Sequence, residues 1–123
     1  MSTITRQKQL PTYITKDGSS ICELMHPAQH KNKNQSLAQA IVPVNTETQL
    51  HYHKLTEELY YIQQGTGLMT LNDKQFNVEA GDTVCIPPNQ KHKIKNTGKT
   101  GLEFLCCCSP AYSHDDTYLE AEE

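Results

Sequence analysis

The stretch HYHKLTEELYYIQQG, residues 51–65, carries the pattern that decides the fold. His51 and His53 are two residues apart, so on a β-strand both imidazoles point to the same face. Glu58 enters from the next predicted strand, and Gly65 permits the tight turn that brings the chain back. Two imidazoles and a carboxylate can therefore reach one point, which predicts a metal site.

A second stretch, GDTVCIPPNQKHKIKN at residues 81–96, adds a third imidazole. His92 begins another predicted strand, after a turn that contains Pro87 and Asn89. Three imidazoles and one carboxylate suit Fe, Mn, Co or Ni, with Cu and Zn as further options, and we expect Fe or Mn. An octahedral shell with these four ligands would leave two positions for water, oxygen or substrate.

Both stretches resemble the two conserved motifs of the cupin superfamily, in its small single-domain form. The first motif matches except at its leading glycine, which is Asn45 here, and the second except at an internal glycine, which is Asn89. Asparagine tolerates the left-handed backbone region better than other residues with a side chain, so both turns can survive. The resemblance implies an all-β jelly-roll β-barrel whose metal ligands are His51, His53, Glu58 and His92.

The carboxylate ligand has a neighbour that could replace it, because Glu57 directly precedes Glu58. A shift of one residue would turn every later side chain of the strand to the other face. With Glu58 inward, Tyr60 and Ile62 also point inward, and the spacing to the following turn is kept. The strand period therefore favours Glu58.

The rest of the chain is typical of an all-β sandwich or barrel, because short apolar runs alternate with turn residues. We expect residues 1–20 to form a flexible lead-in. Residues 21–123 should form one barrel, with the C-terminal tail over or beside it. The strands are predicted at residues 21–25, 36–44, 48–53, 58–64, 67–71, 75–79, 82–86, 91–96 and 101–108.

Composition excludes several classes of function. The 123 residues suffice for one domain, and the net charge of −3 comes with a single arginine and no basic cluster, which argues against nucleic-acid binding. No apolar run has membrane-spanning length, and the N-terminus lacks the apolar core of a secretory signal. The five cysteines are odd in number and three are adjacent, so we expect reduced thiols and a cytoplasmic protein.

The predicted pocket beside the metal is mostly apolar and neutral, with walls of Tyr60, Ile62, Phe104 and one or two cysteines. Tyr60 is a candidate proton donor, and His114 is another if the tail closes the barrel mouth. The tail has two alternatives: it packs outside, or it caps a short final helix begun at Ser113 or Asp115. The Cys106–Cys108 run suggests either a redox or metal role or, as we favour, small buried side chains that alternate between faces.

Three functions are compatible with this pattern. The first is a metal-dependent enzyme of oxygenase type, acting on a small uncharged or anionic chelating molecule. The second is a sugar-phosphate isomerase, which the absence of Lys and Arg from the predicted interior disfavours. The third is a non-catalytic barrel that binds a small ligand or a metal. We also expect a homodimer, because Leu59 and Tyr61 form an outward apolar stripe.

Overall fold

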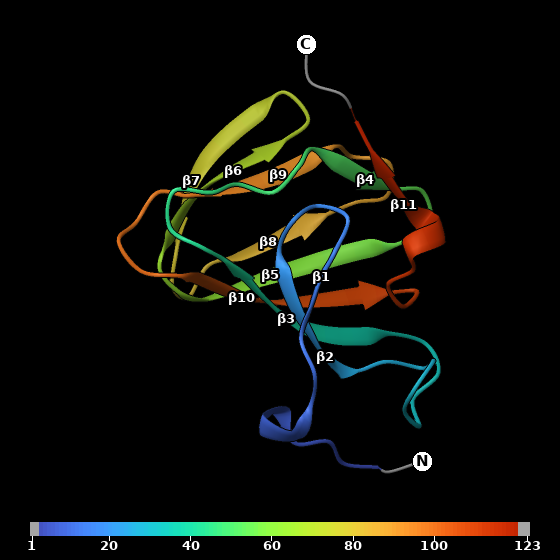
Figure 1. Cartoon of the computed structure of the whole chain (residues 1–123). Helices are drawn as coiled ribbons and strands as arrows, with labels where there is room; N and C mark the ends of the chain where they lie inside the picture. The colour runs from blue at the N-terminus through green and yellow to red at the C-terminus, as the bar shows by residue number, and fades with distance from the viewer. Residues whose placement is uncertain (1–2, 121–123) are drawn as a thin grey trace.

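The computed structural model describes residues 3–120, and within them the chain folds into two antiparallel sheets that face each other (Figure 1). Two short 3-10 helices, η1 and η2, lie near the ends of the chain. The elements, in order, are η1 (Gln7–Gln9), β1 (Tyr13–Ile14), β2 (Ser20–Met25), β3 (Ser36–Val42), β4 (His51–His53), β5 (Glu57–Gln64), β6 (Thr66–Leu71), β7 (Lys74–Glu79), β8 (Thr83–Ile86), β9 (His92–Asn96), β10 (Leu102–Ser109), η2 (His114–Asp116) and β11 (Thr117–Leu119).

The larger sheet has the strand order β1-β2-β3-β10-β5-β8, and the smaller has the order β11-β4-β9-β6-β7. Buried and exposed residues alternate along β3, β5, β9 and β10, as expected for strands with one face toward a core. Each predicted strand overlaps one of β2–β10. The all-β jelly-roll prediction is confirmed.

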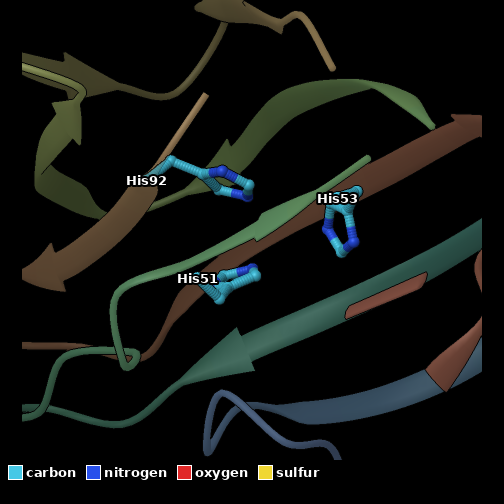
Figure 2. Close-up of side chains that lie close together, drawn as sticks. All are labelled: His51, His53 and His92. Atoms are coloured by element: carbon cyan, nitrogen blue, oxygen red, sulfur yellow. The ribbon is translucent and has the colours of Figure 1, made fainter. Parts of the chain in front are cut away.

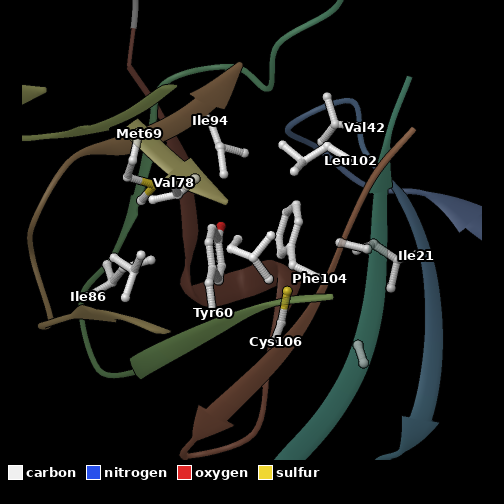
Figure 3. Close-up of a cluster of buried hydrophobic side chains, with 14 residues drawn as sticks. Ile21, Val42, Tyr60, Met69, Val78, Ile86, Ile94, Leu102, Phe104 and Cys106 are labelled. Atoms are coloured by element: carbon white, nitrogen blue, oxygen red, sulfur yellow. The ribbon is translucent and has the colours of Figure 1, made fainter. Parts of the chain in front are cut away.

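Apolar side chains from both sheets fill the space between them (Figure 3). Ile62 and Phe104 come from the larger sheet, and Met69 and Ile94 come from the smaller one; all four are almost completely buried. Gly67 allows a close approach of the strands, because a Cβ there would lie 2.9 Å from both the Leu102 side chain and the Lys95 carbonyl oxygen. Strand β5 connects this core with the predicted metal site, because Ile62 lies in the core and Glu58 faces inward on the same strand.

Two turns have asparagine where the cupin motifs have glycine, and both asparagines adopt a backbone conformation typical of glycine. Asn45 has φ of 64° and Asn89 has φ of 68°, both in the left-handed region. The two asparagines therefore take the places of the missing glycines, as the sequence predicted.

Segments near both ends of the described residues join the sheets. Tyr13 and Ile14 pair with Ile21 and Ser20, so the fold begins before the expected boundary at residue 21. The strand β1 has only two residues and is followed by a polar turn. It is therefore too short to show the alternation of a strand in the sequence, and the segment was expected to be a lead-in. At the other end, β11 pairs with β4, the strand that carries two of the histidines. No helix among residues 3–120 is long and apolar enough to cross a membrane.

Candidate metal centre

Three imidazoles converge inside the barrel (Figure 2). His51 and His53 lie on β4, and His92 lies directly opposite His51 on the paired strand β9. One nitrogen from each ring lies within 4.8 Å of those of the other two. All three residues are buried, and His92 is 0 % exposed. The structure thus contains a three-histidine group that could hold a metal ion.

Each of the three rings uses its Nδ1 atom in a hydrogen bond to the backbone. A carbonyl oxygen can only accept, so Nδ1 carries the proton and the lone pair is on Nε2. This second contact is the usual device that orients a metal-binding imidazole. The contacts are His51 Nδ1 to the Gln49 carbonyl at 2.7 Å, His92 Nδ1 to the Gln90 carbonyl at 2.9 Å, and His53 Nδ1 to the Asp116 carbonyl at 3.3 Å.

Glu58 adds a carboxylate to the same point. Its Oε1 atom lies 3.4 Å from His53 Nε2 and 3.5 Å from His92 Nε2, and the residue is only 5 % exposed. Glu57 points outward on the same strand, so the inward acid is the one that the strand period favours. Glu58 Oε1 and His92 Nε2 are both buried without a hydrogen-bond partner among the described residues. A cation between them would satisfy both atoms, so the residues present fit a metal.

The charge states also suit a metal. Burial alone would raise the pKa of Glu58, but the contacts with His53 and His92 hold it well below its usual range. Burial and the neighbouring His92 lower the pKa of His51 to about 4. Burial also opposes the charged form of His53, yet the carboxylate of Glu58 raises the pKa of His53 above its ordinary value. The site therefore pairs an anionic carboxylate with a neutral His51, the forms that bind metals.

A cavity of about 40 Å³ opens beside His51 and His53. This volume is enough for a few waters or a small ligand. Tyr60, Phe104, Cys106 and Cys108 face it as predicted, whereas Ile62 belongs to the packed core. The lining is mostly apolar, as predicted, but it includes the carboxylates of Asp17, Glu23 and Glu58, so the expectation of a neutral pocket is wrong. The cavity is lined by Tyr13, Thr15, Asp17, Ser19, Ile21, Glu23, Ser36, Ala38, Ala40, His51, His53, Glu58, Tyr60, Phe104, Cys106, Cys108, Tyr112 and Thr117.

The two candidate proton donors have different positions. Tyr60 is buried in the cavity wall with its ring centre 6.1 Å from that of His92. Burial, and then the charge of Glu58, raise the pKa of Tyr60 well above its usual value, so it remains a neutral phenol. His114 is exposed and does not line the cavity; its Nδ1 atom lies 3.2 Å from the Tyr112 hydroxyl. The tail therefore reaches the cavity through Tyr112, and His114 lies outside the cavity lining.

Cys108 contacts the Glu58 carboxylate directly. Its Sγ atom donates a hydrogen bond to Glu58 Oε2 at 3.3 Å. Burial and the nearby Glu58 charge raise the pKa of Cys108 well above its usual value, so the thiol keeps the proton that it donates. Cys106 and Cys108 point inward while Cys107 is on the opposite face, as the alternation predicted. The thiol thus engages one carboxylate oxygen and leaves Oε1 facing the histidines.

Sequence reasoning missed three carboxylates near the site. Asp17 Oδ2 lies 3.6 Å from His51 Nε2, and Glu23 lines the cavity from β2. Asp116 accepts hydrogen bonds from the backbone of residues 54–56 and, through its carbonyl, from His53. Only the Asp17-Gly18 pair gave a sequence signal, since such a dipeptide is typical of a hairpin turn.

Known proteins resemble this chain over most of its length. A protein of Methanocaldococcus jannaschii described as uncharacterised is 54% identical over 115 residues, which cover 94% of this chain and 92% of the relative. An oxalate-binding protein of Thermotoga maritima is 37% identical over 83 residues, which cover 68% of this chain and 64% of the relative.

Solved structures have the same architecture. A predicted oxalate decarboxylase from Thermotoga maritima superposes with a TM-score of 0.76 at 28% identity, covering 88% of this chain and 99% of that one. A polyketide cyclase from Streptomyces resistomycificus gives a TM-score of 0.82 at 16% identity, covering 100% of this chain and 88% of the other, and shows the shared fold alone. The model of the cupin domain matches residues 38–108, which include every histidine and carboxylate of the centre, so this chain belongs to the cupin family.

Proposed function

We propose that the protein binds one divalent transition metal ion, Fe or Mn in preference, through His51, His53, Glu58 and His92, and uses it to transform a small organic molecule. The observation that carries this proposal is the pair of buried atoms without hydrogen-bond partners, Glu58 Oε1 and His92 Nε2, which face each other 3.5 Å apart. Four protein ligands leave part of an octahedral shell open toward the cavity. When bound, the ion would supply Lewis acidity or an electron-transfer route.

The residues around the cavity would orient the ligand and exclude water. Tyr60 and Phe104 pack at 4.5 Å between ring centres and form an apolar wall. The neutral phenol of Tyr60 lines the cavity and is our candidate for donating a proton or a hydrogen bond to a bound ligand. Small side chains, Ala38 and Ala40, leave room on the neighbouring strand.

Elemental analysis tests the centre. Protein purified without chelators should contain close to one Fe or Mn per chain. Glu58→Gln should lower the metal content, because the amide keeps an oxygen but loses the charge. Glu57→Gln is the matched control and should leave the metal content unchanged, since Glu57 points outward. Equal metal content in both variants would reject the assignment of Glu58.

Catalysis is tested separately from binding. The protein loaded with Fe(II) or Mn(II) is offered diketones, catechols and hydroxy acids, while oxygen uptake and product formation are followed. Turnover that disappears in His51→Ala supports an enzyme. Tight binding without turnover supports the non-catalytic alternative, which the oxalate-binding relative favours. A sugar-phosphate isomerase is disfavoured, because no Lys or Arg is among the residues described as lining the cavity.

We also propose a homodimer formed through the outer face of the larger sheet. Leu59 and Tyr61 are 39 % and 45 % exposed, and Leu37 beside them on the same sheet is 37 % exposed. An apolar group of this kind usually finds a partner, and a symmetric dimer is the commonest assembly. Light scattering should give twice the 13.9 kDa chain mass, and Tyr61→Lys should return the monomer value.

A further inference from the structure

The cavity has an acidic wall that is separate from the metal ligands. Asp17 lies in the turn between β1 and β2, and Glu23 lies on β2 itself. Both line the cavity that holds the histidines. Their side chains are only 13 % and 14 % exposed, so these are largely desolvated carboxylates.

Asp17 is held in a fixed orientation. Its Oδ1 atom accepts hydrogen bonds from Thr15 Oγ1 at 2.6 Å, from the Ser19 amide at 2.9 Å and from Ser19 Oγ at 2.6 Å. Its Oδ2 atom accepts none among residues 3–120 and faces His51 Nε2 at 3.6 Å. One oxygen therefore builds the turn, and the other is presented toward the metal centre.

Glu23 has no permanent positive partner among the described residues. The nearest basic atom is His26 Nε2, at 3.7 Å from Glu23 Oε2. That Nε2 donates to the Tyr112 carbonyl at 2.7 Å, while His26 Nδ1 accepts from the Ala28 amide at 3.0 Å. The two hydrogen bonds together require the neutral form of the ring. Burial raises the pKa of Glu23, and the nearby His26 opposes this shift without cancelling it.

The nearby lysine does not balance these charges. Lys16 precedes Asp17 in sequence, but its Nζ atom donates to the carbonyl oxygens of His114 and Thr117. A divalent ion would be neutralised by the carboxylates of Glu58 and Asp17 alone. A dianionic ligand would then add uncompensated negative charge in a poorly solvated cavity, which is costly.

We propose that Asp17 and Glu23 make the cavity select ligands that carry a hydrogen-bond donor or a positive charge beside their metal-binding group. This inference rests on the proposed function, because the metal anchors the other end of the ligand. It separates this chain from a binder of small dianions: oxalate, which the Thermotoga maritima relative is named for, is a dianion and would meet two carboxylates here.

Three hydroxamates test the selection on the Mn-loaded protein: butanohydroxamate, β-alanine hydroxamate and succinic monohydroxamate. They share the metal-binding group, and their tails end in a methyl, an ammonium and a carboxylate. Calorimetry should show the ammonium compound binding about tenfold more tightly than the methyl compound, and the carboxylate compound most weakly. Metal content is measured first on the same sample.

Variants separate the acidic wall from the metal centre. Asp17→Asn keeps the Oδ1 acceptor of the turn, and Glu23→Gln keeps the side-chain shape. The double variant, loaded with Mn to the same occupancy as the wild type, should bind the ammonium and methyl compounds equally, whereas Asp115→Asn, an exposed control, should keep the preference. Equal binding of the two compounds by the metal-loaded wild type would overturn the proposed role of Asp17 and Glu23, and it would leave the proposed metal centre unaffected. A wild type that takes up no metal would overturn both proposals.

Discussion

Two walls of one cavity are built in different ways. One wall, which we call the metal-binding wall after the proposed function, has His51, His53 and Glu58 from β4 and β5, with His92 of β9 packed against His51. The acidic wall takes Asp17 and Glu23 from the β1–β2 hairpin at the start of the chain. The hairpin is tied to the histidine strand by one backbone contact, from the Gln49 amide to the Asp17 carbonyl at 2.8 Å. The four candidate ligands lie within the matched cupin domain, residues 38–108, whereas Asp17 and Glu23 lie outside it, so the two walls come from separate segments.

The largest effect expected from this comparison is on the metal-binding wall. His92→Ala removes a completely buried ligand, and we expect metal affinity to fall by at least about a hundredfold while the barrel stays folded. Metal titration and circular dichroism measure the two quantities. Tyr52→Phe is the control, because Tyr52 lies between His51 and His53 on the opposite face and stacks on Tyr118. Full metal binding by His92→Ala would show that the histidine cluster is structural.

The second largest expected effect is a loss of stability when the contacts of the C-terminal segment are removed. The Asp116 carboxylate accepts hydrogen bonds from the backbone amides of Lys54, Leu55 and Thr56. Asp116→Ala leaves these donors without their acceptor, so we expect the free energy of unfolding to fall by about 2–3 kcal/mol. Denaturant unfolding measures it, with the exposed neighbour Asp115→Ala as the control. An unchanged unfolding midpoint for Asp116→Ala would show that water replaces the carboxylate.

The metal-binding wall could be predicted from sequence because it depends on the strand period. Once β4 and β5 alternate, His51, His53 and Glu58 have to face inward, and the left-handed Asn89 places the turn that leads to His92. The same alternation placed Tyr60 and Cys108 in the cavity. The strand period thus indicated which side chains face inward, and the resemblance to cupins supplied the set of four ligands.

The acidic wall could not be predicted, because it depends on contacts between distant segments. Asp17 approaches His51 only through the pairing of β1 with β2 and the contact with Gln49. Glu23 sits beside a register shift in the β2–β3 pairing, which no period reveals. In the tail, His114 is exposed at the start of η2, whereas Tyr112, two residues earlier, lines the cavity.

Acid should weaken the metal-free protein through His51. Burial and His92 lower the pKa of His51 to about 4, whereas the unfolded chain has an ordinary histidine near 6.5. The unfolded state therefore binds more protons between these values, and stability falls as pH drops from about 6.5 to 4. Urea unfolding of the metal-free wild type and of His51→Gln should diverge across this window, with the wild type losing relatively more stability at the acidic end. Parallel curves would contradict the lowered pKa.

The smallest expected effect concerns Cys108, whose position depends both on the strand period and on a contact with a distant strand. Its position follows from the strand period, but its hydrogen bond to Glu58 Oε2 arises from the pairing of β10 with β5. Cys108→Ala removes that donor and frees the carboxylate to rotate, so we expect metal affinity to fall by about threefold to tenfold. Cys108→Ser offers a shorter hydroxyl donor and should lie between the alanine variant and the wild type. Cys107→Ala, on the outer face of the same strand, should leave metal affinity unchanged. Metal titration of the three variants measures these differences, and equal affinities for Cys108→Ala and Cys107→Ala would show that the histidines alone hold Glu58 in place.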